Sequence, residues 1–99
     1  MYDSFELVTP DDEGAAIAGD YSVAVSDCED GLAIAGQSGI AIACEDYGTA
    51  AAGENGAMVL GYWDTEAHRM RFKIAHVGEN SILPDVAYGL DDNHEFFAL

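Results

Sequence analysis

The sequence predicts an all-β fold: a short flattened β-solenoid of about three 17-residue coils, followed by a C-terminal antiparallel β cap. The first observation is an internal repeat, in which a glycine or serine precedes four or five small and aliphatic residues. The second is that these segments contain β-branched residues and end in turn-forming residues. The third is their spacing, alternately 8 and 9 residues, which makes two short strands per 17-residue period. The segments begin at Gly14, Ser22, Gly31, Gly39, Gly48 and Gly56.

Three periods are present, Gly14 to Asp30, Gly31 to Tyr47 and Gly48 to Asp64. Each coil is expected to lie on the one before it at a strand spacing of about 4.8 Å. In this register two columns of small residues form, and we expect them to face a thin interior between two sheets. The opposite assignment, with the large residues inside, leaves the solenoid prediction unchanged. The columns are Ala16, Ala24, Ala33, Ala41, Ala50 and Ala18, Ser26, Ala35, Ala43, Ala52.

The alternate positions of the repeat are also apolar, and we expect the larger of them to share one face. Either residues 1–8 and the C-terminal third cover part of this face, or part of it stays open and makes a homodimer. The residues predicted for self-association are Val23, Val25, Leu32, Ile34, Ile40 and Ile42.

After residue 64 the repeat gives way to ordinary strand patterning. Residues 69–74 alternate basic and apolar side chains, which predicts a half-buried strand with Arg69, Arg71 and Lys73 on one face. Two further strands, Val86–Leu90 and Glu95–Leu99, are joined by a hairpin turn at residues 91–93. The chain is therefore predicted to be one domain, residues 1–99. It comprises an N-terminal strand and acidic lead-in (1–13), the repeats (14–64) and the cap (65–99).

The charge is strongly one-sided: 19 Asp and Glu against 3 Lys and Arg, a formal net charge of −16. Because 49% of the residues are apolar, the chain is expected to fold rather than remain disordered. Nucleic acid and anionic membranes are excluded as direct partners, since binding a phosphate backbone depends on Lys and Arg. No transmembrane run and no signal-peptide pattern are present, so we expect a cytoplasmic protein, in the host cell if phage-encoded.

The acidic residues follow the 17-residue register at one set of turns, and residues 1–64 contain no basic residue. The opposite turns, around residues 20, 37–38 and 54–55, are poorer in carboxylates. Single-sign patterning indicates a basic protein partner, whereas the simpler alternative is that the acid maintains solubility. The residues predicted to bind the partner are Asp27, Glu29, Asp30, Glu45, Asp46 and Asp64, extended by Asp11, Asp12 and Glu13.

Catalytic, metal and cofactor motifs are not found in the sequence. His68, His76 and His94 lack a metal-ligand spacing, and no phosphate-binding loop or nucleophile elbow occurs. Cys28 and Cys44 are expected to be free thiols of a reducing compartment. The sequence therefore predicts a protein that is not an enzyme and holds no cofactor.

The register Gly-x-x-Ser/Gly-x-Ala-x-Ala resembles small phage and mobile-element solenoid proteins with serine-alanine repeats. The following segment, Gly61-Tyr62-Trp63 with residues 77–85, Tyr88 and Glu95-Phe96-Phe97, looks like the tail of those proteins. For an acidic chain, the resemblance implies a DNA-mimic inhibitor of a host defence complex, most readily an anti-CRISPR protein that blocks target DNA binding. The alternative is a structural, self-associating module.

Overall fold

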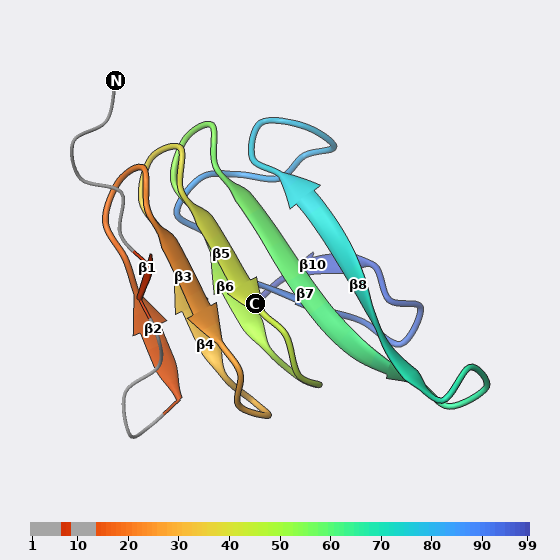
Figure 1. Cartoon of the computed structure of the whole chain (residues 1–99). Coiled ribbons are helices and arrows are strands. Elements are labelled where there is room, and N and C mark those ends of the chain that lie inside the picture. Colours follow the sequence, from red (N-terminus) through yellow and green to blue (C-terminus); the bar gives the residue numbers. More distant parts are fainter. Residues whose placement is uncertain (1–6, 9–13) are drawn as a thin grey trace.

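The computed structural model describes residues 7–8 and 14–99, and this part of the chain forms strands and turns but no helix (Figure 1). The predicted all-β class is therefore confirmed. No helix capable of spanning a membrane occurs in the described ranges. The strands are β1 (Leu7–Val8), β2 (Ala15–Ile17), β3 (Val23–Ser26), β4 (Leu32–Ile34), β5 (Ile40–Ala43), β6 (Thr49–Ala51), β7 (Ala57–Asp64), β8 (Arg69–His76), β9 (Tyr88–Leu90) and β10 (Phe96–Ala98).

The strands form two mixed sheets, and successive strands of the repeat alternate between them. The order is β1-β3-β5-β7-β8 in sheet A and β10-β9-β6-β4-β2 in sheet B. Within the repeat all pairs are parallel and join residues 17 positions apart, such as Ala15 with Leu32 and Val23 with Ile40. The period found in the sequence is thus the register of both sheets.

Alanine side chains make up most of the core between the parallel strands. The first predicted column is fully buried and the second is at most 7% exposed, so the inward assignment of the small residues is confirmed. The Ser26 hydroxyl, which is also fully buried, donates a hydrogen bond to the carbonyl oxygen of Gly14 at 2.8 Å. The large side chains Met58 and Leu60 enter the core on β7, where the repeat ends.

The turns repeat with the strands and press closely on the core. Asp30 and Tyr47 occupy equivalent places in successive coils and share a left-handed backbone, with φ of 60° and 62°. A Cβ atom added at the neighbouring Gly31 would overlap the Ser26 hydroxyl, and one at Gly48 would lie 2.5 Å from the Cβ atom of Ala43. Only glycine fits at these two positions, because the chain passes directly over a core side chain.

The C-terminal third forms the predicted strands β8, β9 and β10, but these extend the sheets and do not cover their faces. β8 pairs antiparallel with β7 at the edge of sheet A. β9 pairs antiparallel with β6, and β10 with β9, at the edge of sheet B. β1 likewise adds to the other edge of sheet A, beside β3. The rest of residues 1–8, the other segment expected to cover the face, lies outside the described residues.

The expectation that six large residues share one face is wrong. Val23, Val25, Ile40 and Ile42 belong to sheet A, whereas Leu32 and Ile34 belong to sheet B. The reason is that each 17-residue period contains two strands, one for each sheet, so consecutive segments turn their outer sides in opposite directions.

The strand predicted at residues 69–74 forms as part of β8, but its apolar side chains are not the buried ones. Phe72 is 52% and Ile74 is 63% exposed, on the outer side of sheet A. Lys73 is the register partner of the buried Leu60, so the basic side of β8 faces the core side of the sheet. β7 and β8 are eight residues long, while the strands of sheet B have three, so sheet A projects beyond the layer beneath it.

We expect the replacement Ala41→Val to lower the free energy of unfolding by about 1–3 kcal/mol. The reason is that Ala41 is fully buried, and the core around it has no space for the larger side chain. Valine has a higher strand propensity than alanine, so propensity alone would raise the stability. A loss of stability therefore indicates that packing decides the outcome. Chemical denaturation measures it. The matched control is Ala57→Val, on an outward position of the same sheet, which we expect to be neutral or slightly stabilising. Equal effects of the two replacements would contradict the account of a closed alanine core.

Candidate functional site

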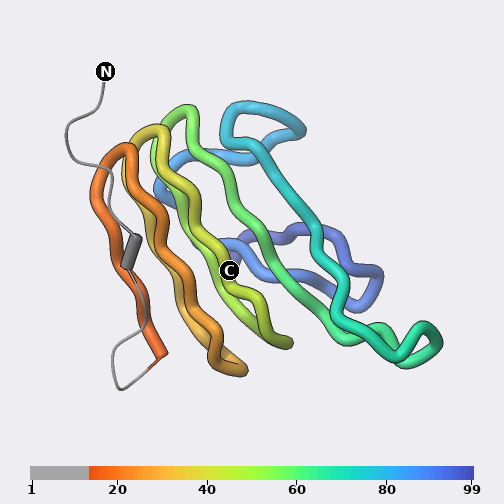
Figure 2. The backbone as a smooth tube through the Cα atoms, in the orientation of Figure 1, coloured from red at the N-terminus to blue at the C-terminus, as the bar shows by residue number. Residues whose placement is uncertain are grey.

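Four loops of the structure gather at one edge of the two sheets. The turns after β3 and β5 are hydrogen-bonded to each other, with the Asp30 N–H donating to the Asp46 carbonyl oxygen at 3.0 Å. The β7–β8 hairpin lies beside them along the same side of the molecule (Figure 2). The β9–β10 turn arrives there because β9 runs antiparallel to β6. We call nine of the carboxylates of these loops the acidic edge: Asp27, Glu29, Asp30, Glu45, Asp46, Asp64, Glu66, Asp91 and Asp92.

The acidic edge contains carboxylates that are free of internal partners. Within the described part of the chain, the side chains of Glu29, Asp30 and Glu45 make no hydrogen bond or ion pair. All three are exposed. Asp27 is exposed too, and the only hydrogen bond its side chain makes with the described residues is a long one from the thiol of Cys28, 3.8 Å between sulfur and oxygen. Four carboxylates on two stacked turns therefore face solvent, as predicted.

Asp46 has a structural role as well as a place at the acidic edge. Its Oδ1 atom accepts a hydrogen bond of 2.6 Å from the N–H of Trp63, 17 residues further on. Asp20 does the same at the opposite edge for the N–H of Gln37, at 2.8 Å. Each side chain thus satisfies a backbone N–H group 17 residues further along the chain.

Asp64 was predicted to bind the partner together with these carboxylates, but in the structure its charge is compensated. Its Oδ2 atom lies 2.7 Å from Nε of Arg71, and its Oδ1 atom accepts hydrogen bonds from the N–H groups of Glu66 and Ala67. The hydrogen bond from Arg71, followed by those from the backbone, lowers the pKa of this carboxyl. Asp64 thus stabilises the β7–β8 hairpin and adds no uncompensated charge to the acidic edge. Asp11, Asp12 and Glu13 lie outside the described residues.

Three acidic residues of this edge were not predicted: Glu66 of the β7–β8 hairpin, and Asp91 and Asp92 of the β9–β10 turn. Antiparallel pairing of β9 with β6 brings Asp91 and Asp92 next to the turn that contains Asp46. The sequence did identify residues 91–93 as a hairpin turn, but that pattern does not say which strand the hairpin joins. The opposite edge has fewer carboxylates, at Asp20 and Glu54 of its turns and at Glu79 and Asp85 of the loop that bonds to them.

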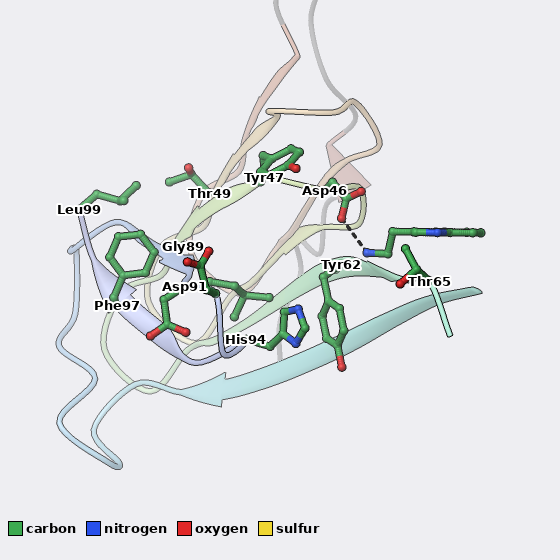
Figure 3. A pocket seen from close by; sticks show the side chains of 15 residues that line it. Asp46, Tyr47, Thr49, Tyr62, Thr65, Gly89, Asp91, His94, Phe97 and Leu99 are labelled. Carbon is green, nitrogen blue, oxygen red and sulfur yellow. Dashed lines mark hydrogen bonds between the residues drawn. The ribbon is translucent and has the colours of Figure 1, made fainter. Parts of the chain in front are cut away.

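A cavity of about 470 Å³ opens between the β5–β6 turn, β7 and the β9–β10 hairpin (Figure 3). Tyr47 and Thr49 stand on one side of it, Tyr62, His94 and Asp91 on the other, and Phe97 with Leu99 closes a third side. The rings of Tyr62 and His94 are stacked, with centroids 3.7 Å apart and planes inclined by 11°. The acidic edge therefore continues into a cavity with aromatic walls.

Both cysteines are free and lie on the stacked turns of the acidic edge, Cys28 exposed and Cys44 partly buried. The Cys44 thiol donates to the Ser26 carbonyl oxygen at 3.3 Å. Burial raises the pKa of this thiol, and the nearby carboxylates of Glu45 and Asp27 raise it further. Across residues 7–8 and 14–99, no three His, Cys, Asp or Glu side chains are grouped so that they could hold a metal ion.

Comparison with protein-family models, curated proteins and solved structures gives no match to this chain. Its function is therefore inferred from the geometry of the acidic edge and the neighbouring cavity.

We expect Cys28 to react several-fold faster than Cys44 with a disulfide reagent at about pH 8, because reactivity follows the thiolate fraction and exposure. The raised pKa of Cys44 reduces its thiolate at that pH. The single variants Cys28→Ser and Cys44→Ser isolate the two thiols, and the absorbance of released thionitrobenzoate gives their rates. Equal rates, or a faster Cys44, would show that Cys44 is more open than this structure has it.

Proposed function

We propose that this protein is a non-enzymatic, acidic DNA mimic that occupies the nucleic-acid-binding surface of a host defence complex. The most specific form of the proposal is an anti-CRISPR protein that blocks target DNA binding. The observation that carries it is the pair of stacked turns whose carboxylates, at Asp27, Glu29, Asp30 and Glu45, face solvent.

The spacing of these turns supports the proposal. Parallel neighbours in a sheet repeat every 4.8 Å or so, and the stacked turns after β3 and β5 carry three and two carboxylates. DNA carries about one charge per 1.7 Å of axis, so the linear charge density of the edge is comparable. Mixed charges would be enough for solubility, whereas no Lys or Arg occurs in residues 1–64.

A rigid frame for these charges is part of the proposal. We infer that residues 14–64 form a short β-solenoid of about three 17-residue coils and that residues 65–99 form its cap. The identical 17-residue registers of both sheets support this inference. So do the antiparallel strands that replace the parallel ones after β7. Such a frame holds carboxylates at fixed separations, which a flexible acidic tail does not.

The proposed partner is the basic DNA-binding surface of a CRISPR effector or another defence protein in the host cytoplasm. The chain itself would bind neither nucleic acid nor membrane, since its net charge of −16 repels both. The proposal needs no cofactor, because inhibition rests on occupancy of the partner's surface.

Two matched charge-reversal variants test the proposal: Glu29→Lys with Glu45→Lys at the acidic edge, and Glu54→Lys with Glu79→Lys at the opposite edge. All four glutamates are exposed, and each variant changes the net charge by the same amount, from −16 to −12. Displacement of labelled target DNA from purified CRISPR effector complexes and restriction enzymes is measured. We expect the acidic-edge variant to inhibit at least about tenfold less well than the wild type, and the control to inhibit nearly normally.

Inhibition should also weaken steeply between about 50 mM and about 200 mM salt, because exposed charges are screened. The proposal fails if the wild type displaces DNA from none of these complexes. It also fails if the two variants lose inhibition equally, since net charge alone would then explain the effect. Asp46 is left intact in this design because it also holds the Trp63 N–H.

A second candidate function, self-association through sheet A, is favoured by a separate observation. The outer side of β3, β5, β7 and β8 is apolar and carries exposed Ile40, Trp63, Phe72 and Ile74. Among the described residues of these four strands none on this side is a carboxylate, so a second copy of the same face meets it without opposing the charges at the edges. The four strands cover about 400 Å² per protomer, which is enough for a weak dimer only.

We expect a homodimer at about 100 µM protein and moderate salt, with twice the 10.5 kDa mass of the chain by light scattering. The dimer should weaken at low salt, because two acidic chains repel. Ile74→Lys on sheet A should give the monomer, while Ile17→Lys on sheet B, at nearly equal exposure (63% and 62%), should not. A monomeric wild type, or a monomer from both variants, would exclude sheet A as the contact.

A further inference from the structure

The cavity beside the acidic edge combines two kinds of wall, carboxylates and aromatic rings. Asp46, Asp91 and Asp92 bring the carboxylates, from the β5–β6 and β9–β10 turns. Tyr47, Tyr62 and Phe97 bring rings from three separate elements, and Leu90 with Leu99 adds aliphatic surface. Sites that combine acidic groups with aromatic faces favour organic cations, because both attract positive charge.

Backbone hydrogen bonds hold two of these carboxylates in place. Asp91 Oδ1 accepts from the N–H groups of Asn93 and Glu95, at 2.9 and 3.0 Å. Asp46 Oδ1 accepts from Trp63. In each case the second carboxylate oxygen makes no hydrogen bond or ion pair with the described residues. Two oriented acceptors are therefore available on opposite walls before any ligand binds.

The charge balance of the cavity also favours a cation. Its described lining includes no lysine or arginine, and Arg71, the strand neighbour of Tyr62, is bonded to Asp64. A smaller cavity of about 280 Å³ on the other side of His94 differs in this respect, since Lys73 lines it. The carboxylates of the larger cavity are not grouped as a metal site. The ligand that fits is an extended cation whose charge is spread over several donors.

We propose that this cavity binds an alkylguanidinium group, the side chain of arginine. A planar guanidinium stacks on aromatic rings and donates to two carboxylates at once, while its alkyl stem packs on aliphatic surface. The assignment of the arginine to a protein rests on the proposed function: the side chain belongs to the basic partner and inserts beside the stacked turns. The cavity would then make the mimic specific for a surface with a protruding arginine. The carboxylates of the acidic edge alone do not provide this specificity.

Titration of the ¹⁵N-labelled full chain with N-acetyl-arginine methylamide tests the proposal by NMR. We expect saturable shifts around residues 47–49, 62 and 89–94, with a dissociation constant on the order of 1 mM. The lysine derivative should bind roughly fivefold or more weakly, because it lacks the planar fork of donors. The double variant Asp91→Asn with Asp92→Asn keeps the Oδ1 acceptor that bonds Asn93 and Glu95. It should weaken binding of the arginine derivative roughly tenfold.

The matched control is Asp20→Asn with Asp85→Asn at the opposite edge, which removes the same charge and should bind like the wild type. Non-saturable shifts, equal affinity for the lysine derivative, or equal losses in both variants would overturn the proposal. Agmatine and a blocked Gly-Arg-Gly peptide distinguish the two sources of a guanidinium group, a free metabolite and a protein side chain. If agmatine binds far more tightly than the peptide, the ligand is a free metabolite, and the assignment to the partner's arginine is wrong. If the protein binds the peptide but displaces no DNA, the assignment of the cavity to a guanidinium group holds and only the proposed function fails.

Discussion

The close approach of the two sheets, which alanine side chains allow, constrains the rest of this molecule. Strands β2 to β6 each have a fully buried alanine at their centre, so only small side chains fill the interior between them. Polar chemistry is therefore restricted to the turns at the two edges and to the region after β7. Glycine is required at Gly31 and Gly48, before β4 and β6, because the turns pass directly over Ser26 and Ala43 and leave no room for a side chain.

The acidic residues at the edges fall into two groups, those whose side chains bond to the rest of the fold and those whose side chains do not. Asp20 and Asp46 each accept a hydrogen bond from a backbone N–H 17 residues further on, and Asp64 holds the β7–β8 hairpin with Arg71. These carboxylates are part of the fold and lose their role if they are replaced. Glu29, Asp30 and Glu45 hold nothing within the described chain. Because free carboxylates of like charge repel one another at every step of the stack, their accumulation is a cost to stability that a basic partner would remove.

The transition from parallel to antiparallel pairing at β7 creates the features that a pure repeat would lack. β8 lengthens sheet A beyond sheet B and exposes Phe72 and Ile74. β9 and β10 lengthen sheet B and carry Asp91 and Phe97 to the turn that contains Tyr47. The cavity therefore lies at the junction of the repeat with the following segment, where side chains are large enough to form walls. The free edge strand β8 contains all three basic residues of the chain, a distribution that opposes edge-to-edge pairing with another β8.

The sequence by itself determined the all-β class, the 17-residue register and the inward columns, because each depends on a short period that the covalent chain repeats. It also located the strands of the last third and the turns with Asp27, Glu29, Asp30 and Glu45. The tertiary structure alone decided that Val23 and Leu32 belong to opposite sheets and that Arg71 neutralises Asp64. It also decided that Asp91 reaches the cavity beside Asp46. These outcomes depend on which strands pair after the repeat ends, and long-range pairing is selected by the packing of whole sheets, which no local pattern encodes.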